Sequence, residues 1–384
     1  MPGPSAAPLA IFYLLYFCTV GVLLPFLPAY LRALGLSASE AGVAQSVSPV
    51  VMLVVPPLWG HYADRTGRHG RVLVTLCLGT GAGLVLLWFA TSFPEVLLAL
   101  AVNAAFASAV VPMADALALQ HVGANGGTYA GIRRFGSIGF VASSLAFGAL
   151  VHEVDARVIF VPLVAIGVSA AWAAVALSRG PAVVGDGPRP ELAQAPRLLK
   201  QPGVRTVLGA GALHWIAATP YHGSLAPHLL SLGEDTSLVG VCAATGVASE
   251  VALLSLWPRI HARVKSPRTV ILFSIAVSAL RWWGMAATNS GWVVVALAGL
   301  HGIGFGTFYV ASVEWMTQET PDSLRATGQA LLFATIFGVG GVVGYATSGR
   351  VYDLLGGHTL FGLAGAFELL PALLLLRFRP AAHT

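Results

Sequence analysis

The sequence predicts an all-α integral membrane protein with twelve transmembrane helices in two six-helix halves. The chain of 384 residues is 56% hydrophobic and only 10% charged, whereas an average soluble domain carries about a quarter charged residues. Its apolar blocks run about 20 residues or more, which is long enough to cross a hydrocarbon layer of about 30 Å as helices. These blocks lack the alternating pattern of an outer-membrane barrel, so helical spans are expected.

Each apolar block is assigned one span, and clusters of Pro, Gly and charged residues mark the connections. The predicted spans are 9–33, 38–60, 72–92, 95–121, 129–151, 156–178, 204–231, 236–258, 269–288, 291–318, 324–351 and 357–377. The first nine residues carry no charge and no small-residue cleavage site follows them, so we expect the first span to be retained. Cys18, Cys77 and Cys242 have neither disulfide nor metal-ligand spacing and are expected to pack between helices.

Lysine and arginine predict the orientation of the spans. One set of loops and tails holds Arg65, Arg68, Arg71, Arg133, Arg134, Arg179, Arg189, Arg197, Lys200, Arg205, Arg259, Arg263, Lys265, Arg268, Arg325, Arg377 and Arg379, and the opposite set holds Arg32, Arg157 and Arg350. This bias predicts a multi-pass protein of the cytoplasmic (inner) membrane with both termini in the cytoplasm. It also explains the net charge of +5 without a nucleic-acid partner.

The longest loop, SRGPAVVGDGPRPELAQAPRLLKQPG, follows the sixth span and is rich in Pro and Gly. We therefore predict an N-terminal half over 1–178, a cytoplasmic linker over 179–203 and a C-terminal half over 204–384. Two six-span halves joined in this way suit a transporter that rocks about a site at the membrane midplane.

A loop between the second and third spans, GHYADRTGRHGR, combines two glycines, an Asp-Arg pair and further basic residues. This pattern resembles the signature loop of the major facilitator superfamily. The matching positions are Gly60, Asp64, Arg65, Gly67, Arg68 and Arg71. Because Asp64 can accept hydrogen bonds from a helix N-terminus or from Arg68, the loop is predicted to act as a conformational latch. The equivalent loop after the eighth span, PRIHARVKSPR, lacks the Asp-Arg pair and the glycines.

Charged side chains inside apolar spans cost roughly 2.5–3.5 kcal/mol each at a helix centre and usually serve a function. The spans contain Asp115, Glu250, Arg281, Glu314 and Glu368, with Arg133 about one turn inside the fifth span. Glu314 lies near the cytoplasmic end of its span, where a structural role is equally expected, and Glu368 lies on the last span, which is usually peripheral in the superfamily.

Asp115 and Arg133 occur on consecutive antiparallel spans joined by the short loop GANGGT. An ion pair between them would offset the desolvation that either charge alone would suffer. The planar fork of donors on Arg133 also suits a substrate carboxylate or a pair of hydroxyls. Arg133 is therefore a candidate for substrate binding.

The segments DALAL, YAGIRRFGSIGF, ATGVASEV, SALRWWG and GLHGIGFGTFYV together resemble the phenylpropionate permease branch of this superfamily and, more distantly, the lactose permease branch of sugar:proton symporters. The resemblance implies that Asp115 and Arg133 hold the substrate. It also implies that Arg281 and His301 belong to the proton-coupling group. The coupling carboxylate that the lactose permease branch keeps one turn after the histidine is replaced here by Gly304.

In this resemblance, Glu250 matches the acid that the lactose permease branch carries on its eighth span to within one helical turn, as in the phenylpropionate permease branch. Since the eighth span descends and the ninth returns, Glu250 and Arg281 are expected at comparable depth, at about 1.5 Å per residue. A carboxyl group that gains and loses a proton beside a guanidinium would be a proton switch, whereas a permanently charged pair would only fasten two helices. We predict the switch, with Asp115 as the second choice of proton carrier.

The seventh span, GALHWIAATPYHGSLAPHLL, carries several polar and aromatic side chains. His214 and Tyr221 share one stripe of the helix, and Trp215 and His222 share the adjacent one. His214, Tyr221 and Trp215 are predicted to line the substrate cavity by hydrogen bonding and stacking. The histidines lack accompanying ligands at zinc spacing, so no metal site is predicted.

The function predicted from these features is proton-coupled symport of a small organic solute, such as an aromatic carboxylate, a sugar or a nucleoside. The chain is expected to work as a monomer, without enzymatic activity and without a cofactor other than the coupled proton; no ATP-binding loop is present. A proton-coupled antiporter that exports drugs is the alternative within transport. A receptor without turnover is the alternative from another class, against which the latch loop and the paired inner charges argue.

Overall fold

The computed structural model describes residues 6–126, 128–151, 167 and 194–378. These residues lie in helices and in the turns and loops between them, with no strand in the described part of the chain. Eight helical stretches within it are long and apolar enough to cross a membrane. The predicted all-helical membrane fold is therefore confirmed.

Contacts divide the chain into two compact units. The first unit takes its described residues from Met1–Leu36, Val47–Asp186 and Asp235–Ala244, and the second takes them from Ser37–Ser46, Gly187–Glu234 and Thr245–Thr384. Residues 179–193 of the predicted linker lie outside the described residues, as does the predicted span 156–178 apart from Gly167.

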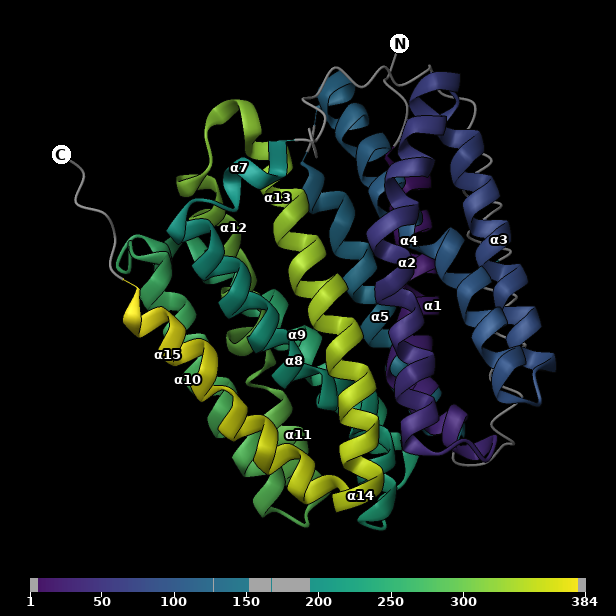
Figure 1. Cartoon of the computed structure of the whole chain (residues 1–384). Helices are drawn as coiled ribbons and strands as arrows, with labels where there is room; N and C mark the ends of the chain where they lie inside the picture. Colours follow the sequence, from purple (N-terminus) through teal and green to yellow (C-terminus); the bar gives the residue numbers. More distant parts are fainter. Residues whose placement is uncertain (1–5, 127, 152–166, 168–193, 379–384) are drawn as a thin grey trace. The chain divides into compact units, whose positions relative to one another are not determined.

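The first unit is built from long, apolar helices. They are α1 (Ala7–Ala33), most of α2 (Ala38–Thr66), α3 (His69–Phe89), α4 (Phe93–Asn125) and α5 (Tyr129–Val151). Helix α1 packs along α5, and α3 packs along α4 (Figure 1). Gly21 allows α1 and α5 to approach closely, since a Cβ at this position would lie only 2.5 Å from the carbonyl oxygen of Phe140.

The second unit contains more interruptions. Its elements are α7 (Ala195–Leu198), α8 (Pro202–Ser231), most of α9 (Thr236–His261), α10 (Pro267–Ala287), α11 (Gly291–Ala298), η3 (Gly302–Thr307), α12 (Phe308–Glu319), η4 (Asp322–Leu324), α13 (Arg325–Phe333), η5 (Ala334–Gly340), α14 (Gly341–Phe367) and α15 (Leu369–Arg377). Helix α14 packs against both α8 and α10.

Two predicted spans of the second unit change helical geometry along their length. The span predicted at 291–318 contains the π-helical turn η3, and the span predicted at 324–351 contains η5. Both turns are rich in glycine, in the segments GIGFGT and ATIFGVG. A π-helical turn widens the helix and leaves carbonyl groups available for other partners, and such turns often occur at functional sites.

The last two predicted spans meet at Gly356. Its φ of +77° lies in the left-handed region, which residues with a side chain rarely adopt. The helix axis therefore changes direction at Gly356, within α14. A second boundary follows at Glu368, which separates α14 from α15. Glu368 therefore lies at a helix junction, and its side chain is fully buried.

Candidate functional site

Helices α1, α4 and α5 bring together a small polar cluster in the first unit. The Tyr13 hydroxyl donates a hydrogen bond to Oδ1 of Asp115. The Arg133 guanidinium lies 4.0 Å from the ring centroid of Phe17 and 5.4 Å from that of Tyr13. Asp115 and Arg133 are both half-buried, whereas Arg134 is exposed, as the helical offset between the two arginines predicts.

The structure brings Asp115 and Arg133 to the same cluster but not into the direct ion pair that we expected. Among the described residues no ion pair within 4 Å joins them, and the side chain of Tyr13 contacts both. Tyr13 was missed from the sequence because its partner is 102 residues away. The only sequence signal was the aromatic run FYLLYF, and such a run does not distinguish aromatic residues that pack in the core from those that bind substrate.

Arg281 is buried in the second unit, with a side chain that is only 2% exposed. Its guanidinium carbon lies 3.9 Å from the ring centroid of Tyr221 and 4.6 Å from that of Trp282. Aromatic faces attract a cation, and a guanidinium sheds its water more readily than an ammonium. These two rings therefore explain how an arginine is tolerated within an apolar helix.

His301 connects Arg281 with Glu250. Nη1 of Arg281 lies 3.4 Å from Nδ1 of His301, and Nε2 of His301 lies 3.9 Å from Oε2 of Glu250. Since an arginine can only donate, this geometry favours the His301 tautomer with its hydrogen on Nε2, toward Glu250. Three of the predicted proton-coupling residues thus form one chain, while Asp115, the fourth, belongs to the first unit.

Half-buried aromatic side chains surround this chain of charges. We define the aromatic surface as Trp215, His222, His301, Phe305, Tyr309 and Phe337. Trp215 lies 4.8 Å from Phe337 and 5.3 Å from His222 between ring centroids, and Phe305 lies 5.3 Å from His301. Tyr221 joins this surface through His301, at 6.0 Å.

His214 is enclosed instead of lining the aromatic surface. Its side chain is 2% exposed, and both ring nitrogens have partners: Nδ1 lies 2.9 Å from Oε2 of Glu368, and Nε2 lies 3.0 Å from the carbonyl oxygen of Gly304. In this structure His214 therefore does not reach the predicted substrate cavity. Its partner Glu368, expected to be peripheral, is one of the most buried charged groups of the second unit.

The predicted latch loop forms a tight turn between α2 and α3. Gly67 has φ +64°, which a glycine adopts without strain. Oδ1 of Asp64 lies 3.1 Å from Nε2 of His69, the first residue of α3. We expected Asp64 to accept from the backbone of a helix N-terminus or from Arg68, whereas this contact is made by the side chain of His69. His69 was not among the residues predicted to form the latch, which are Gly60, Asp64, Arg65, Gly67 and Arg68.

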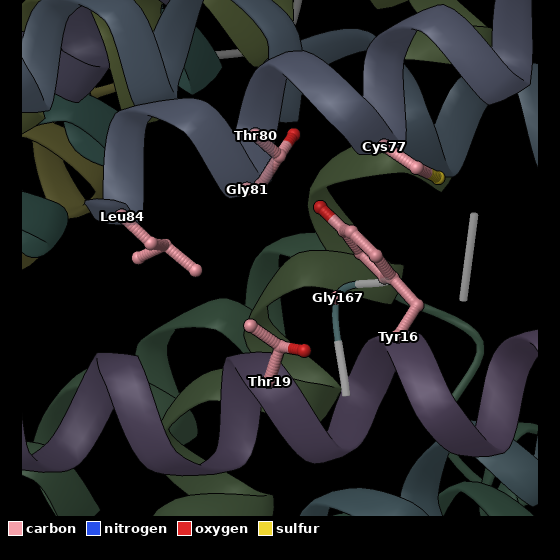
Figure 2. Close-up of a pocket in the computed structure, with 7 residues that line it drawn as sticks. All are labelled: Tyr16, Thr19, Cys77, Thr80, Gly81, Leu84 and Gly167. Atoms are coloured by element: carbon pink, nitrogen blue, oxygen red, sulfur yellow. The ribbon is translucent and has the colours of Figure 1, made fainter. Parts of the chain in front are cut away.

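Figure 2 shows a narrow pocket in the first unit, between α1 and α3. Its lining residues are Tyr16, Thr19, Cys77, Thr80, Gly81, Leu84 and Gly167. The Tyr16 hydroxyl donates to the Ala107 carbonyl at 3.3 Å, and the Thr80 hydroxyl donates to the Leu76 carbonyl at 2.8 Å. Because no predicted site residue lines it, this pocket is not assigned as the substrate site.

The fold is that of membrane transporters of the major facilitator superfamily. The crystal structure of the nucleoside transporter NupG superimposes with a TM-score of 0.84, covering 97% of this chain and 99% of that one, at 17% sequence identity. At that identity the likeness concerns the fold alone.

Sequence comparison then gives the family. The model of the MFS_1 like family matches residues 7–363, so the chain belongs to this family. It is 31% identical to a maltose permease of Geobacillus stearothermophilus, over 86% of this chain and 83% of the permease. It is 26% identical to a probable 3-phenylpropionic acid transporter of Escherichia coli K12, over 96% of both chains. These relatives are solute transporters, and the predicted membership of the superfamily is confirmed.

Proposed function

We propose that this protein is a proton-coupled symporter that carries a small aromatic carboxylate across the membrane by alternating access. The observation that supports this most directly is that each unit places a guanidinium against aromatic rings. Arg133 lies over Phe17 and Tyr13, and Arg281 lies over Tyr221 and Trp282. A carboxylate needs a forked donor, whereas an aromatic ring needs flat apolar partners.

Substrate binding is proposed for Asp115 and Arg133 of the first unit and for Tyr221 and Trp215 of the second. The half-buried rings of the aromatic surface offer faces for stacking, and such contacts contribute about 0.5–1.5 kcal/mol beyond the area they bury. One relative of this chain is a probable 3-phenylpropionic acid transporter, which agrees with this substrate class. The maltose permease and the nucleoside transporter fold make a sugar and a nucleoside the comparison substrates.

Proton coupling is proposed for the titratable groups of the second unit. Glu250 and His301 lie within 4 Å of one another, beside Arg281, so a proton moving among them would change the charge next to the aromatic surface. The arrangement of basic loops supports a location in the cytoplasmic membrane with both termini inside the cell. The working unit is proposed to be the monomer.

The test is uptake by proteoliposomes that contain the purified chain and have an alkaline interior. Labelled 3-phenylpropionate, maltose and uridine are supplied outside in parallel. We expect the chain to accumulate 3-phenylpropionate, and a protonophore to abolish the accumulation. Because a weak acid enters alkaline vesicles by itself, vesicles without protein and vesicles with the Arg133→Lys variant set the baseline.

Other outcomes separate the competing functions. Accumulation of maltose or uridine alone would keep the symport mechanism and replace the substrate class. Loss of a preloaded substrate in exchange for entering protons would indicate an antiporter. If none of the three substrates moves faster than in vesicles without protein, in either direction, the proposed function is wrong.

A further inference from the structure

A second set of buried polar groups lies apart from the aromatic surface, at the junction of α14 and α15. Glu368 is 0% exposed and His214 is 2% exposed. One carboxylate oxygen, Oε2, lies 2.9 Å from Nδ1 of His214, and the other, Oε1, accepts a hydrogen bond from the Trp282 indole at 3.2 Å. Nε2 of His214 lies 3.0 Å from the carbonyl oxygen of Gly304.

The partners of His214 fix where its hydrogens must be. A carbonyl oxygen can only accept, so Nε2 must carry a hydrogen to bond Gly304. The contact between Nδ1 and Glu368 then needs one further proton. This proton is either on Nδ1, which gives an imidazolium beside a carboxylate, or on Glu368, which gives a neutral imidazole beside a carboxylic acid. Without it, a lone pair on Nδ1 would face a negative oxygen at 2.9 Å.

We propose that the His214–Glu368 pair is a proton site that is loaded and emptied during transport. The inference deepens the proposed function and rests on its proton coupling. It adds this enclosed pair to the proton-coupling groups of the second unit, where the sequence pointed first to Glu250. The pair is neutral overall when loaded and carries one negative charge when empty, so its two states differ greatly in how well a buried site tolerates them.

Emptying the site must disturb at least one hydrogen bond. If the remaining hydrogen of His214 moves to Nδ1 to satisfy the charged Glu368, Nε2 no longer donates to Gly304; if it stays on Nε2, the contact with Glu368 becomes repulsive. Gly304 belongs to the π-helical turn η3, which begins directly after His301. The geometry therefore connects the protonation of the pair to the backbone of η3.

Trp282 connects the His214–Glu368 pair with Arg281 and Tyr221. Its indole nitrogen donates to Glu368, while its ring lies 4.6 Å from the Arg281 guanidinium and 5.9 Å from the ring of Tyr221. A substrate that displaces Arg281 or Tyr221 would therefore press on a residue that holds the proton site. Such a contact is what a coupling mechanism requires, because a ligand shifts an equilibrium only through differential contacts.

Among the described residues, no other charged or titratable group on the surrounding helices is hydrogen-bonded to the pair. On α10, Arg281 contacts Tyr221 and His301. On α8, the ring of His222 lies 5.3 Å from Trp215, and on α14, Nδ1 of His358 lies 2.9 Å from the Ala286 carbonyl. On α12, Glu314 contacts His261. Within the described residues, the pair has no ionisable partner besides its own two members.

The Glu368→Gln variant removes the titrating carboxyl group but keeps its hydrogen bonds. The carboxamide can donate to Nδ1 of a neutral His214 and accept from Trp282, so all three hydrogen bonds persist without a titrating group. Infrared difference spectra of the purified protein, recorded between about pH 4 and pH 10, cover the range in which carboxyl and imidazole groups titrate. We expect a carboxylic-acid or imidazolium band that titrates in the wild-type protein and is absent from Glu368→Gln.

Glu314→Gln is the matched control, because it removes an acid that also faces a histidine but is partly exposed. This variant should keep the titrating band of the buried pair. Identical difference spectra for wild-type protein and Glu368→Gln would overturn the proposal, whatever the transported solute. A thermal unfolding curve close to that of the wild type would show that Glu368→Gln is folded.

Transport gives an independent readout. With 3-phenylpropionate as the probe, Glu368→Gln should exchange label across the membrane at equal pH but lose accumulation driven by a pH gradient, falling to the level of vesicles without protein. Glu314→Gln, the matched control, should still accumulate the probe. Accumulation that persists in Glu368→Gln would overturn the inference and leave the coupling role with Glu250 and His301. If the wild-type chain accumulates nothing, the proposed function fails, and the infrared titration still decides whether the pair holds the proton.

Discussion

The two units bury charge in different ways. In the first unit the Asp115 cluster contains one acid, one arginine, the hydroxyl and rings of α1, and the side chain of Tyr129 at the start of α5. In the second unit the fully buried Glu368 and the partly exposed Glu250 each face a histidine. The first arrangement presents an arginine to a polar substrate, whereas the second places carboxyl groups against histidines, between which a proton can move.

This difference favours a substrate-binding role for the first unit and a proton-coupling role for the second. An arginine stays charged through the transport cycle, so Arg133 is suited to recognise a carboxylate in every state. A histidine beside a carboxyl group changes its hydrogen bonds with each protonation, so the second unit is suited to respond to the proton gradient. Four substitutions test these two roles, from the largest expected effect to the smallest.

Arg133→Lys should lower uptake of 3-phenylpropionate by about 100-fold, nearly as much as Arg133→Ala. The positive charge remains, but the forked donor is lost, and a hydrogen bond to a charged group contributes about 1.5–3 kcal/mol. Initial uptake rates over a range of substrate concentrations measure the effect. Wild-type affinity in the lysine variant would show that the first unit needs only a positive charge.

Tyr13→Phe should weaken substrate binding by about tenfold and leave the maximal rate nearly unchanged, because the hydroxyl positions Asp115 and does not carry the proton. Tyr16→Phe is the matched control on the same helix, since its hydroxyl donates only to the Ala107 carbonyl, at 3.3 Å. Saturation curves for both variants provide the comparison. A change in gradient-driven accumulation without a change in affinity would move coupling into the first unit.

Trp282→Phe should shift the pH dependence of uptake and reduce accumulation by about three- to tenfold. The ring over Arg281 is largely retained, but the donor to Glu368 is lost, at a cost of about 0.5–1.5 kcal/mol for one hydrogen bond. Trp283→Phe, at a position that is 40% exposed, is the control. Equal pH profiles for the two variants would show that Trp282 acts only by packing.

His261→Gln should change uptake by less than about twofold. His261 and Glu314 form the same type of pair as His214 and Glu368, but their side chains are 42% and 26% exposed and their atoms are 3.5 Å apart. Pairs exposed to solvent contribute about 0–1 kcal/mol. A large loss of gradient-driven uptake in this variant would mean that burial is not what makes a His–Glu pair functional here.

The site could be predicted in part because buried charge is visible in a sequence. Asp115, Glu250 and Arg281 lie in apolar runs, where a charge is costly enough to require a partner. The resemblance to known permeases added His301, and the structure placed it between Glu250 and Arg281. The roles of these residues remain predictions until the variants above are measured.

The partners could not be predicted, because they depend on which helices meet. Tyr13 contacts Asp115 across 102 residues, and His214 contacts Glu368 across 154 residues. Neither pair has a local spacing that would reveal it. Glu368 was expected to be peripheral because the last span usually is, and the junction of α14 and α15 places it inside instead.

The sequence by itself determined the helical membrane class, the orientation signal of the basic loops and the residues that had to be buried charges. These properties follow from local composition, since transfer of a side chain or a whole helix into lipid depends mainly on its own chemistry. Only the tertiary structure decided that His214 is a partner of Glu368 and not a cavity residue. Hydrogen bonds are short and directional, so the hydrogens of His214 are set by the Gly304 carbonyl and the Glu368 carboxylate, which α8 meets only after the second unit has folded.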